Sequence, residues 1–191
     1  MNEPWINVST RVDARRGVPY GPIIATDRLG FRSRLVGPRP AIDGPPPVGP
    51  KLVLVEDSDD DAMLFILALR QSGRNVSAAR AATAAEARQL LAGARPALIV
   101  LDCHLPGESG LDLLREIRSL QSFGRVPIVM MSGSESDSDV QAAYANGANS
   151  FLRKSPSYME YMSCVNTLLE YWLDRNCTAG LSKTPNCVWV G

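Results

Sequence analysis

Residues 97–102 read Ala-Leu-Ile-Val-Leu-Asp, a run of five apolar side chains that ends on a carboxylate. Residues 52–57 repeat the order as Leu-Val-Leu-Val-Glu-Asp, and residues 126–132 read Val-Pro-Ile-Val-Met-Met-Ser. Short runs that are apolar at successive positions are typical of strands covered on both faces, as in a parallel sheet between two helical layers. We therefore predict three central strands here, and weaker strands at about 75–80 and 149–152.

Helix-forming segments separate these strands. Apolar side chains recur at helical spacing over residues 62–69, and residues 84–91 are rich in strong helix formers. A third helix opens after Gly110, a fourth is predicted over residues 136–146 and a long fifth over residues 157–175. This alternation predicts five βα units, which form a doubly wound, five-stranded parallel sheet in a flavodoxin-like three-layer α/β sandwich.

The two ends of the chain differ in composition from the domain predicted over residues 51–175. Residues 1–50 hold most of the 14 prolines, three of them consecutive at 45–47, and show no regular period. We expect a disordered, Pro/Gly-rich N-terminal arm, unless the start site has been assigned too far upstream. Residues 176–191 are again aperiodic and are predicted to form a C-terminal tail.

Composition argues against several classes of protein. The net charge is zero, which favours neither a nucleic-acid nor an anionic-membrane partner. No apolar stretch approaches the ~18 residues of a membrane span, and the N-terminus lacks the pattern of a signal peptide. The four cysteines show no metal-binding spacing. We expect a cytoplasmic protein that binds neither nucleic acid nor membrane.

Chemically active side chains follow four of the predicted strands. Glu56 and Asp57 come after the first strand, Asp102 after the third, Ser132 after the fourth and Lys154 after the fifth. Each group follows a parallel strand, so we expect all of them at the edge of the sheet formed by the carboxyl ends of the strands. Ligands of doubly wound sheets bind at this edge. Two carboxylates ~4 Å apart repel by ~4 kcal/mol at an effective dielectric near 20, and a hard cation such as Mg²⁺ relieves this. The set predicts a phosphoryl-transfer site with a carboxylate nucleophile.

Four motifs, in this order, resemble those of CheY-like response-regulator receiver domains. They are Leu-Val-Glu-Asp at 54–57, the strand end and Pro/Gly loop at 101–110, Met-Met-Ser-Gly at 130–133 and Phe-Leu-Arg-Lys at 151–154. The extended fifth helix, with Glu-Tyr-Trp-Leu at 170–173, is similar to the small receivers that partner bacterial phytochromes.

The resemblance implies a set of roles around the phosphoacceptor. Asp102 would take a phosphoryl group from a histidine kinase or a phosphotransfer protein. Glu56 and Asp57 would bind Mg²⁺, with Asp102 and the backbone carbonyl of His104 completing the protein ligands. We assign the acids at 59–61 to the first turn of the following helix, where carboxylates favour the positive end of the helix dipole.

The resemblance also implies a switch. Lys154 would contact the phosphoryl group, Ser132 would swing inward to bind it, and Phe151 would follow into the vacated space. Cys103 and His104 lie in the loop next to the phosphoacceptor, where they could modulate hydrolysis of the aspartyl phosphate. The alternatives are a thiol that only packs and an imidazole that is only solvated.

The fifth helix carries two adjoining apolar stripes, more than one sheet face requires. We expect the second stripe to form an interface, with a homodimer through the fourth and fifth βα units as the first hypothesis. The predicted interface residues are Tyr158, Tyr161, Leu168 and Trp172.

We expect a stand-alone response regulator, because the residues after 175 are too few for an output domain. Its histidine kinase would be a bacteriophytochrome if the subgroup resemblance holds, and it would signal by binding a downstream protein. One alternative is a relay intermediate that passes the phosphoryl group to a histidine phosphotransfer protein. Others are a metal-dependent phosphohydrolase, a flavin-binding module and a receiver that works without phosphorylation. We expect no enzymatic activity beyond Mg²⁺-dependent self-phosphorylation and autodephosphorylation.

Overall fold

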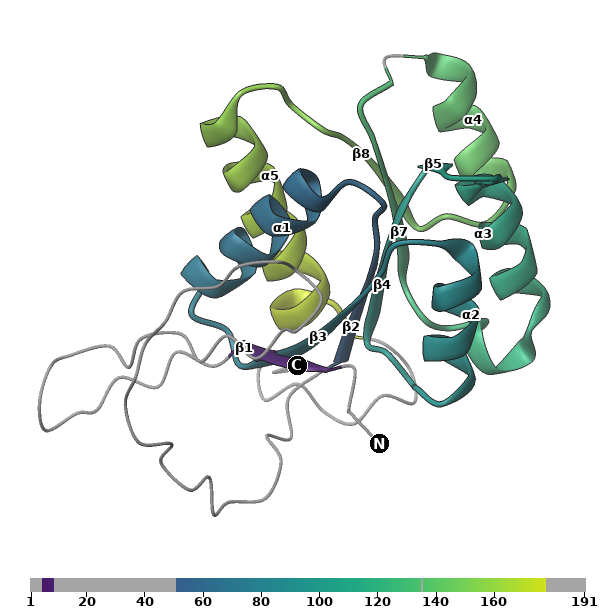
Figure 1. The fold of residues 1–191 in the computed structure, drawn as a ribbon, viewed down its shortest axis with the longest axis horizontal. Helices are drawn as coiled ribbons and strands as arrows, with labels where there is room; N and C mark the ends of the chain where they lie inside the picture. Colours follow the sequence, from purple (N-terminus) through teal and green to yellow (C-terminus); the bar gives the residue numbers. More distant parts are fainter. Residues whose placement is uncertain (1–4, 9–50, 135, 178–191) are drawn as a thin grey trace, which may run out of the picture.

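The computed structural model describes residues 5–8, 51–134 and 136–177, which form a three-layer α/β domain (Figure 1). Five strands run parallel in the order β3-β2-β4-β7-β8. Their bounds are β2 (Lys51–Val55), β3 (Val76–Ala81), β4 (Leu98–Asp102), β7 (Ile128–Ser132) and β8 (Ser150–Arg153). The predicted doubly wound, five-stranded parallel sheet is confirmed.

Helices cover both faces of the sheet. In Figure 1, α1 and α5 lie on one side, and α2, α3 and α4 lie on the other. The bounds are α1 (Asp59–Gln71), α2 (Ala84–Ala92), α3 (Gly110–Ser119), α4 (Asp137–Ala145) and α5 (Tyr158–Leu169). Among the described residues, no helix is both long and apolar enough to cross a bilayer.

Within residues 51–177, three short features were not predicted. They are the hairpin of β5 (His104–Leu105) and β6 (Glu108–Ser109), the 3₁₀ turn η1 (Gln121–Phe123) and the π-helical turn η2 (Glu170–Arg175). The hairpin strands hold two residues each, too few to show a period in the sequence. The predicted fifth helix is correct in extent, but its last turn widens into η2.

Strand β2 is apolar at successive positions because both of its faces are buried. Leu52 and Leu54 belong to the core cluster formed with α1 and α5, while Val53 and Val55 belong to the cluster on the α2 and α3 side. All four side chains are at most 2% exposed. A central strand of this kind has no solvent face, so it shows no polar alternation.

The N-terminal arm differs from the prediction where the structure describes it. Residues 6–8 form β1 (Ile6–Val8), which pairs antiparallel with β3 along its outer edge. A three-residue strand is too short to produce a recognisable pattern, and the open edge of β3 supplies its hydrogen-bond partners. The other parts of the predicted arm and tail, residues 1–4, 9–50 and 178–191, lie outside the described residues.

Trp5, next to β1, joins the arm to the domain. The indole is half-buried against the core cluster on the α2 side, and the Lys51 ammonium lies 4.8 Å from its ring centroid.

We therefore expect Trp5→Ala to lower the free energy of unfolding by about 1–2 kcal/mol, from lost packing and a lost cation–π contact. Urea denaturation followed by circular dichroism measures this change. Unchanged midpoints for both Trp5→Ala and a chain lacking residues 1–8 would contradict the packing.

Candidate functional site

The carboxyl ends of the parallel strands bring four of the predicted site residues to one rim. Glu56 follows β2, Asp102 ends β4, Ser132 ends β7, and Lys154 follows β8. The first three are nearly inaccessible, with 3%, 6% and 0% of their surfaces exposed. Buried charges are rare unless they are paired, so each carboxylate here needs a partner.

Lys154 is that partner. Its Nζ donates to Glu56 Oε2 at 2.7 Å, to Asp61 Oδ2 at 2.8 Å, and to Asp102 Oδ2. Oxygens of the three carboxylates lie within 4.8 Å of one another. Three carboxylates around one ammonium leave an excess of negative charge. The site therefore favours a further hard cation bound through oxygen.

Burial and hydrogen bonding shift the pKa values of Glu56 and Lys154 in this cluster. Burial raises the pKa of Glu56 to about 7, although the hydrogen bond from Lys154 opposes the shift. Burial by itself lowers the pKa of Lys154. The hydrogen bonds to Asp102, Asp61 and Glu56 outweigh this effect and raise that pKa above its ordinary value. Lys154 thus stays charged across the neutral range, while Glu56 exchanges its proton near pH 7.

The loop after β4 holds the Asp102 carboxylate from behind. The backbone N–H of His104 donates to Asp102 Oδ1 at 2.8 Å, which leaves Oδ2 facing Lys154. Gly110 must be glycine, because a Cβ there would lie 1.9 Å from the Asp102 carbonyl oxygen. Gly107, at φ +78°, turns the chain between β5 and β6. The His104 N–H thus orients the carboxylate, and the two glycines allow the chain to turn back closely against the end of β4.

Two acids near the start of α1 differ in their relation to the cluster: Asp61 lies in the first turn of α1, as predicted, and also joins the cluster, whereas Asp57 does not. The Asp57 side chain is exposed and lies outside the three-carboxylate cluster, so its metal-binding role stays a prediction. Asp61, assigned to the helix terminus, belongs to the cluster. Ser58 is the N-cap and accepts from the Asp61 N–H, while the Ser58 N–H donates to Glu56 Oε1. An acid three residues after an N-cap usually bonds back to the cap N–H. Here Glu56 satisfies that group, and Asp61 is free to pair with Lys154.

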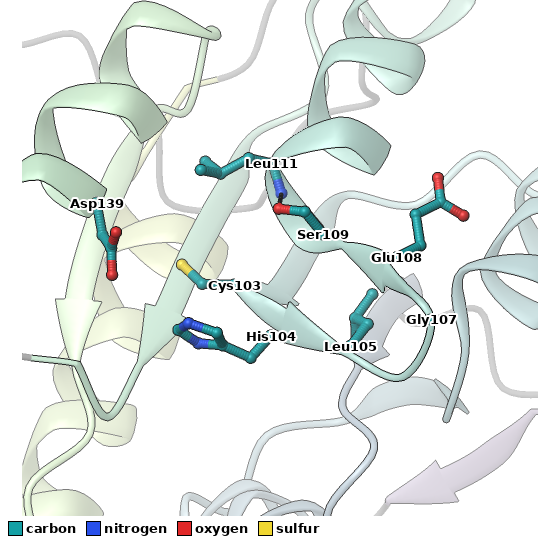
Figure 2. Close-up of a pocket in the computed structure, with 8 residues that line it drawn as sticks. All are labelled: Cys103, His104, Leu105, Gly107, Glu108, Ser109, Leu111 and Asp139. Atoms are coloured by element: carbon teal, nitrogen blue, oxygen red, sulfur yellow. Dashed lines mark hydrogen bonds between the residues drawn. The ribbon is translucent and has the colours of Figure 1, made fainter.

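A pocket of about 440 Å³ opens beside this rim, between the β5–β6 hairpin and α4. Figure 2 shows Asp139 of α4 on the opposite side of it from Cys103 and His104. Its lining comprises Cys103, His104, Leu105, Gly107, Glu108, Ser109, Leu111 and Asp139. Burial raises the pKa of the Cys103 thiol to about 11, so the thiol stays protonated. His104 is exposed, and the modulating role of these two residues stays a prediction.

The predicted interface is wrong at two positions. Tyr161 and Leu168 are each 4% exposed and belong to the domain's own core. The reason is that α5 packs against both the sheet and α1, so that both apolar stripes have partners within the chain. Tyr158 is 46% exposed and Trp172 is half-buried in η2, and their interface role stays a prediction. Phe151 is half-buried against the core on the α2 side, and its switching role is likewise a prediction.

A family model for the response regulator receiver domain matches residues 52–165. The chain belongs to this family. Its members are phosphoacceptor switches of two-component signalling, which agrees with the predicted function. The matched region contains β2 to β8 and most of α5, and so the whole rim described above.

Individual relatives agree with this assignment. The probable methanogenesis regulatory protein FilR2 of Methanothrix harundinacea is 31% identical over 135 residues, which are 68% of this chain and 87% of FilR2. Response regulator Rcp1 of a Synechocystis strain is 34% identical over 80 residues, 42% of this chain and 54% of Rcp1. This chain therefore spans about half the length of Rcp1 in that alignment.

Solved receiver structures share the fold. The Mn²⁺-bound form of Rcp1 superposes with a TM-score of 0.63 at 27% identity, covering 68% of this chain and 98% of Rcp1. The phosphorylated cyanobacterial phytochrome response regulator RcpA gives a TM-score of 0.65 at 30% identity, covering 69% of this chain and 99% of RcpA. The resemblance to phytochrome-associated receivers, noted from residues 170–173, thus extends over the whole domain.

Removing the ammonium tests the electrostatics of the receiver rim. Lys154→Met leaves buried carboxylates unpaired, and we expect the metal-free protein to lose about 3 kcal/mol of unfolding free energy at pH 8. The loss should shrink by pH 5.5. Burial raises the folded pKa of Glu56 above its unfolded value, and the variant also lacks the Lys154 hydrogen bond that lowers this pKa to about 7 in the wild type. The variant is therefore most stable at low pH, and its loss relative to the wild type grows as pH rises past the range in which the wild-type carboxyl ionises. Urea denaturation in EDTA at both pH values measures this.

Arg175→Met is the control for the Lys154 variant. It removes an exposed ion pair with Glu170, which contributes at most about 1 kcal/mol and does not depend on the rim. Equal losses for Lys154→Met at pH 5.5 and pH 8 would contradict a Glu56 carboxyl that titrates near neutrality.

Proposed function

We propose that this receiver accepts a phosphoryl group on Asp102 from a histidine kinase or a phosphotransfer protein and signals through contacts with other proteins. The observation that carries the proposal is the buried ion cluster in which Lys154 bridges Asp102 and Glu56 at the mouth of the sheet. An aspartate at a strand end that had no functional role would not require a lysine and a second buried carboxylate beside it. A carboxylate that must receive an anionic group needs cations beside it.

We infer that Mg²⁺ is the cation of this site. The donors at hand are carboxylate oxygens of Glu56 and Asp102. Asp57 lies in the adjoining β2–α1 loop, and the backbone carbonyl of His104 lies in β5, just after Asp102. Oxygen donors combined with excess negative charge fit Mg²⁺ or Mn²⁺ better than softer metals. The related Rcp1 has been solved in a Mn²⁺-bound form. When bound, the cation would neutralise charge on the transferring phosphoryl group.

The residues of the chain then have distinct tasks. A carboxylate oxygen of Asp102 attacks phosphorus, and the donor's nitrogen–phosphorus bond breaks as the oxygen–phosphorus bond forms. The His104 N–H keeps Oδ1 in place during this step. Lys154 moves its hydrogen bonds from carboxylate to phosphoryl oxygens. Ser132 turns inward to bind another oxygen, and Phe151 follows it, which carries the signal to α4 and β8.

The likeness to RcpA supports a phytochrome-type histidine kinase as the phosphoryl donor. Transfer onward to a histidine phosphotransfer protein uses the same aspartyl phosphate and is the second route we retain. Exposed aromatic side chains on α4, α5 and η2 support a homodimer through the fourth and fifth βα units. These side chains are Tyr144, Tyr158 and Tyr171. No observation favours a phosphohydrolase, since position 104 carries an exposed histidine in place of a second acid.

Phosphorylation by a small-molecule donor tests the proposal directly. Acetyl phosphate with Mg²⁺ should add one phosphoryl group to the wild-type chain. Asp102→Asn should abolish the addition, because an amide oxygen is too weak a nucleophile for this transfer. Intact-mass spectrometry and phosphate-affinity gels measure the product. Asp60→Asn, at an exposed acid outside the cluster, is the matched control and should be modified like the wild type. Modification of Asp102→Asn to the wild-type level would refute the assignment.

A further inference from the structure

Arg80 holds the acidic loop between β2 and α1 from the side opposite Lys154. It lies on β3, one residue before the strand ends, and its side chain is only 15% exposed. Its Nε donates to the Glu56 carbonyl at 2.9 Å, and one terminal nitrogen donates to the Asp57 carbonyl at 2.8 Å. The other terminal nitrogen pairs with Asp59 Oδ1 at 2.6 Å. One guanidinium therefore contacts three of the first four residues after β2.

We propose that Arg80 is a positioning residue for the cation site. Its guanidinium fixes the backbone of residues 56 and 57, so that the carboxylates of Glu56 and Asp57 are presented to the metal in one geometry. The inference deepens the proposed function and rests on it, since it assigns a second layer of support to the same site. Arg80 itself contacts neither the metal nor the phosphoryl group.

The loop needs such support because of its own charge. Glu56, Asp57 and residues 59–61 place five acids within six positions, and like charges at this spacing drive the segment apart. The Glu56 N–H is anchored to the sheet through the Ala81 carbonyl at 2.9 Å. Helix α1 begins only at Asp59. Between these points, Arg80 adds two hydrogen bonds to the backbone and a positive charge that leaves the front of the site open.

The geometry of the contact selects arginine. Its two carbonyl bonds come from adjacent nitrogens of one planar group and reach two consecutive residues. A lysine ammonium carries the same charge on a flexible stem but has no rigid fork. A positioning role therefore predicts that lysine does not restore function at residue 80.

Electrostatics and positioning make opposite predictions for the loss of Arg80. If Arg80 acts only through its charge, removing a cation near the site strengthens the binding of another cation. If Arg80 positions the loop, its removal weakens cation binding. The loop then has to become ordered when the cation binds, and this ordering reduces the binding free energy. Loss of an outer-layer contact at metal sites typically weakens affinity by 10–100-fold. The sign of the change therefore separates the two explanations.

The experiment titrates the metal-free, full-length chain with Mn²⁺ and follows the electron paramagnetic resonance signal of the free ion, with Mg²⁺ measured by competition. We expect Arg80→Met and Arg80→Lys each to weaken binding by about 10-fold or more. Arg74→Met is the matched control, since Arg74 is a similarly buried arginine paired with Asp174 away from the rim. It should bind Mn²⁺ like the wild type. Asp59→Asn leaves both carbonyl bonds intact and should change affinity by less than about 3-fold.

Hydrogen–deuterium exchange gives a second readout that needs no metal. Amides of residues 55–62 should exchange faster in metal-free Arg80→Met than in Arg74→Met, whatever the two variants lose in global stability. Unchanged or tighter Mn²⁺ binding by Arg80→Met would overturn the inference, as would full rescue by Arg80→Lys. Wild-type phosphorylation on Asp102 is assayed in parallel. Its failure would count against the proposed function, whereas normal wild-type transfer with unchanged variant affinity would overturn the role of Arg80 alone.

Discussion

A single ammonium, that of Lys154, holds together the rim on which this receiver depends. Its three carboxylate partners come from the end of β2, the first turn of α1 and the end of β4, while Lys154 itself follows the edge strand β8. In the sheet, β4 and β7 separate β2 from β8. The ion cluster thus links the centre of the sheet to its edge. A change at Asp102 reaches β8 directly, because it alters what Lys154 can bind.

The same cluster explains how the site remains folded without a metal. Buried carboxylates without a counter-charge destabilise a domain by several kcal/mol. Lys154 supplies part of that charge from the front, and Arg80 supplies part from behind the loop. In the proposed mechanism, a bound divalent cation would take over the neutralisation of the carboxylates and free Lys154 for the phosphoryl group. The ammonium that stabilises the metal-free receiver would then contact the phosphoryl group in the loaded one.

Sequence patterns predicted most of this architecture, because burial on both faces of a strand, and the position at a strand end, depend on residues that are close together in the sequence. Runs apolar at successive positions identified β2, β4 and β7, and the position after each strand identified Glu56, Asp102 and Lys154 as neighbours. The role of Asp61 could not be predicted, since it depends on which group satisfies the cap N–H of Ser58. Burial of Tyr161 was missed because the packing of α5 against α1 is a tertiary contact. Strand β1 was too short to give a pattern.

A crystal structure with Mn²⁺ and beryllofluoride tests most directly whether these groups converge to hold a metal and an acyl phosphate. Beryllofluoride stands in for the phosphoryl group on a carboxylate. We expect beryllium on Asp102, an anomalous manganese peak between Asp102 and Glu56, and the Lys154 ammonium on a fluoride. Manganese bound away from this rim, or Lys154 still paired with Asp61 and Glu56 beside a beryllofluoride-bearing Asp102, would contradict it.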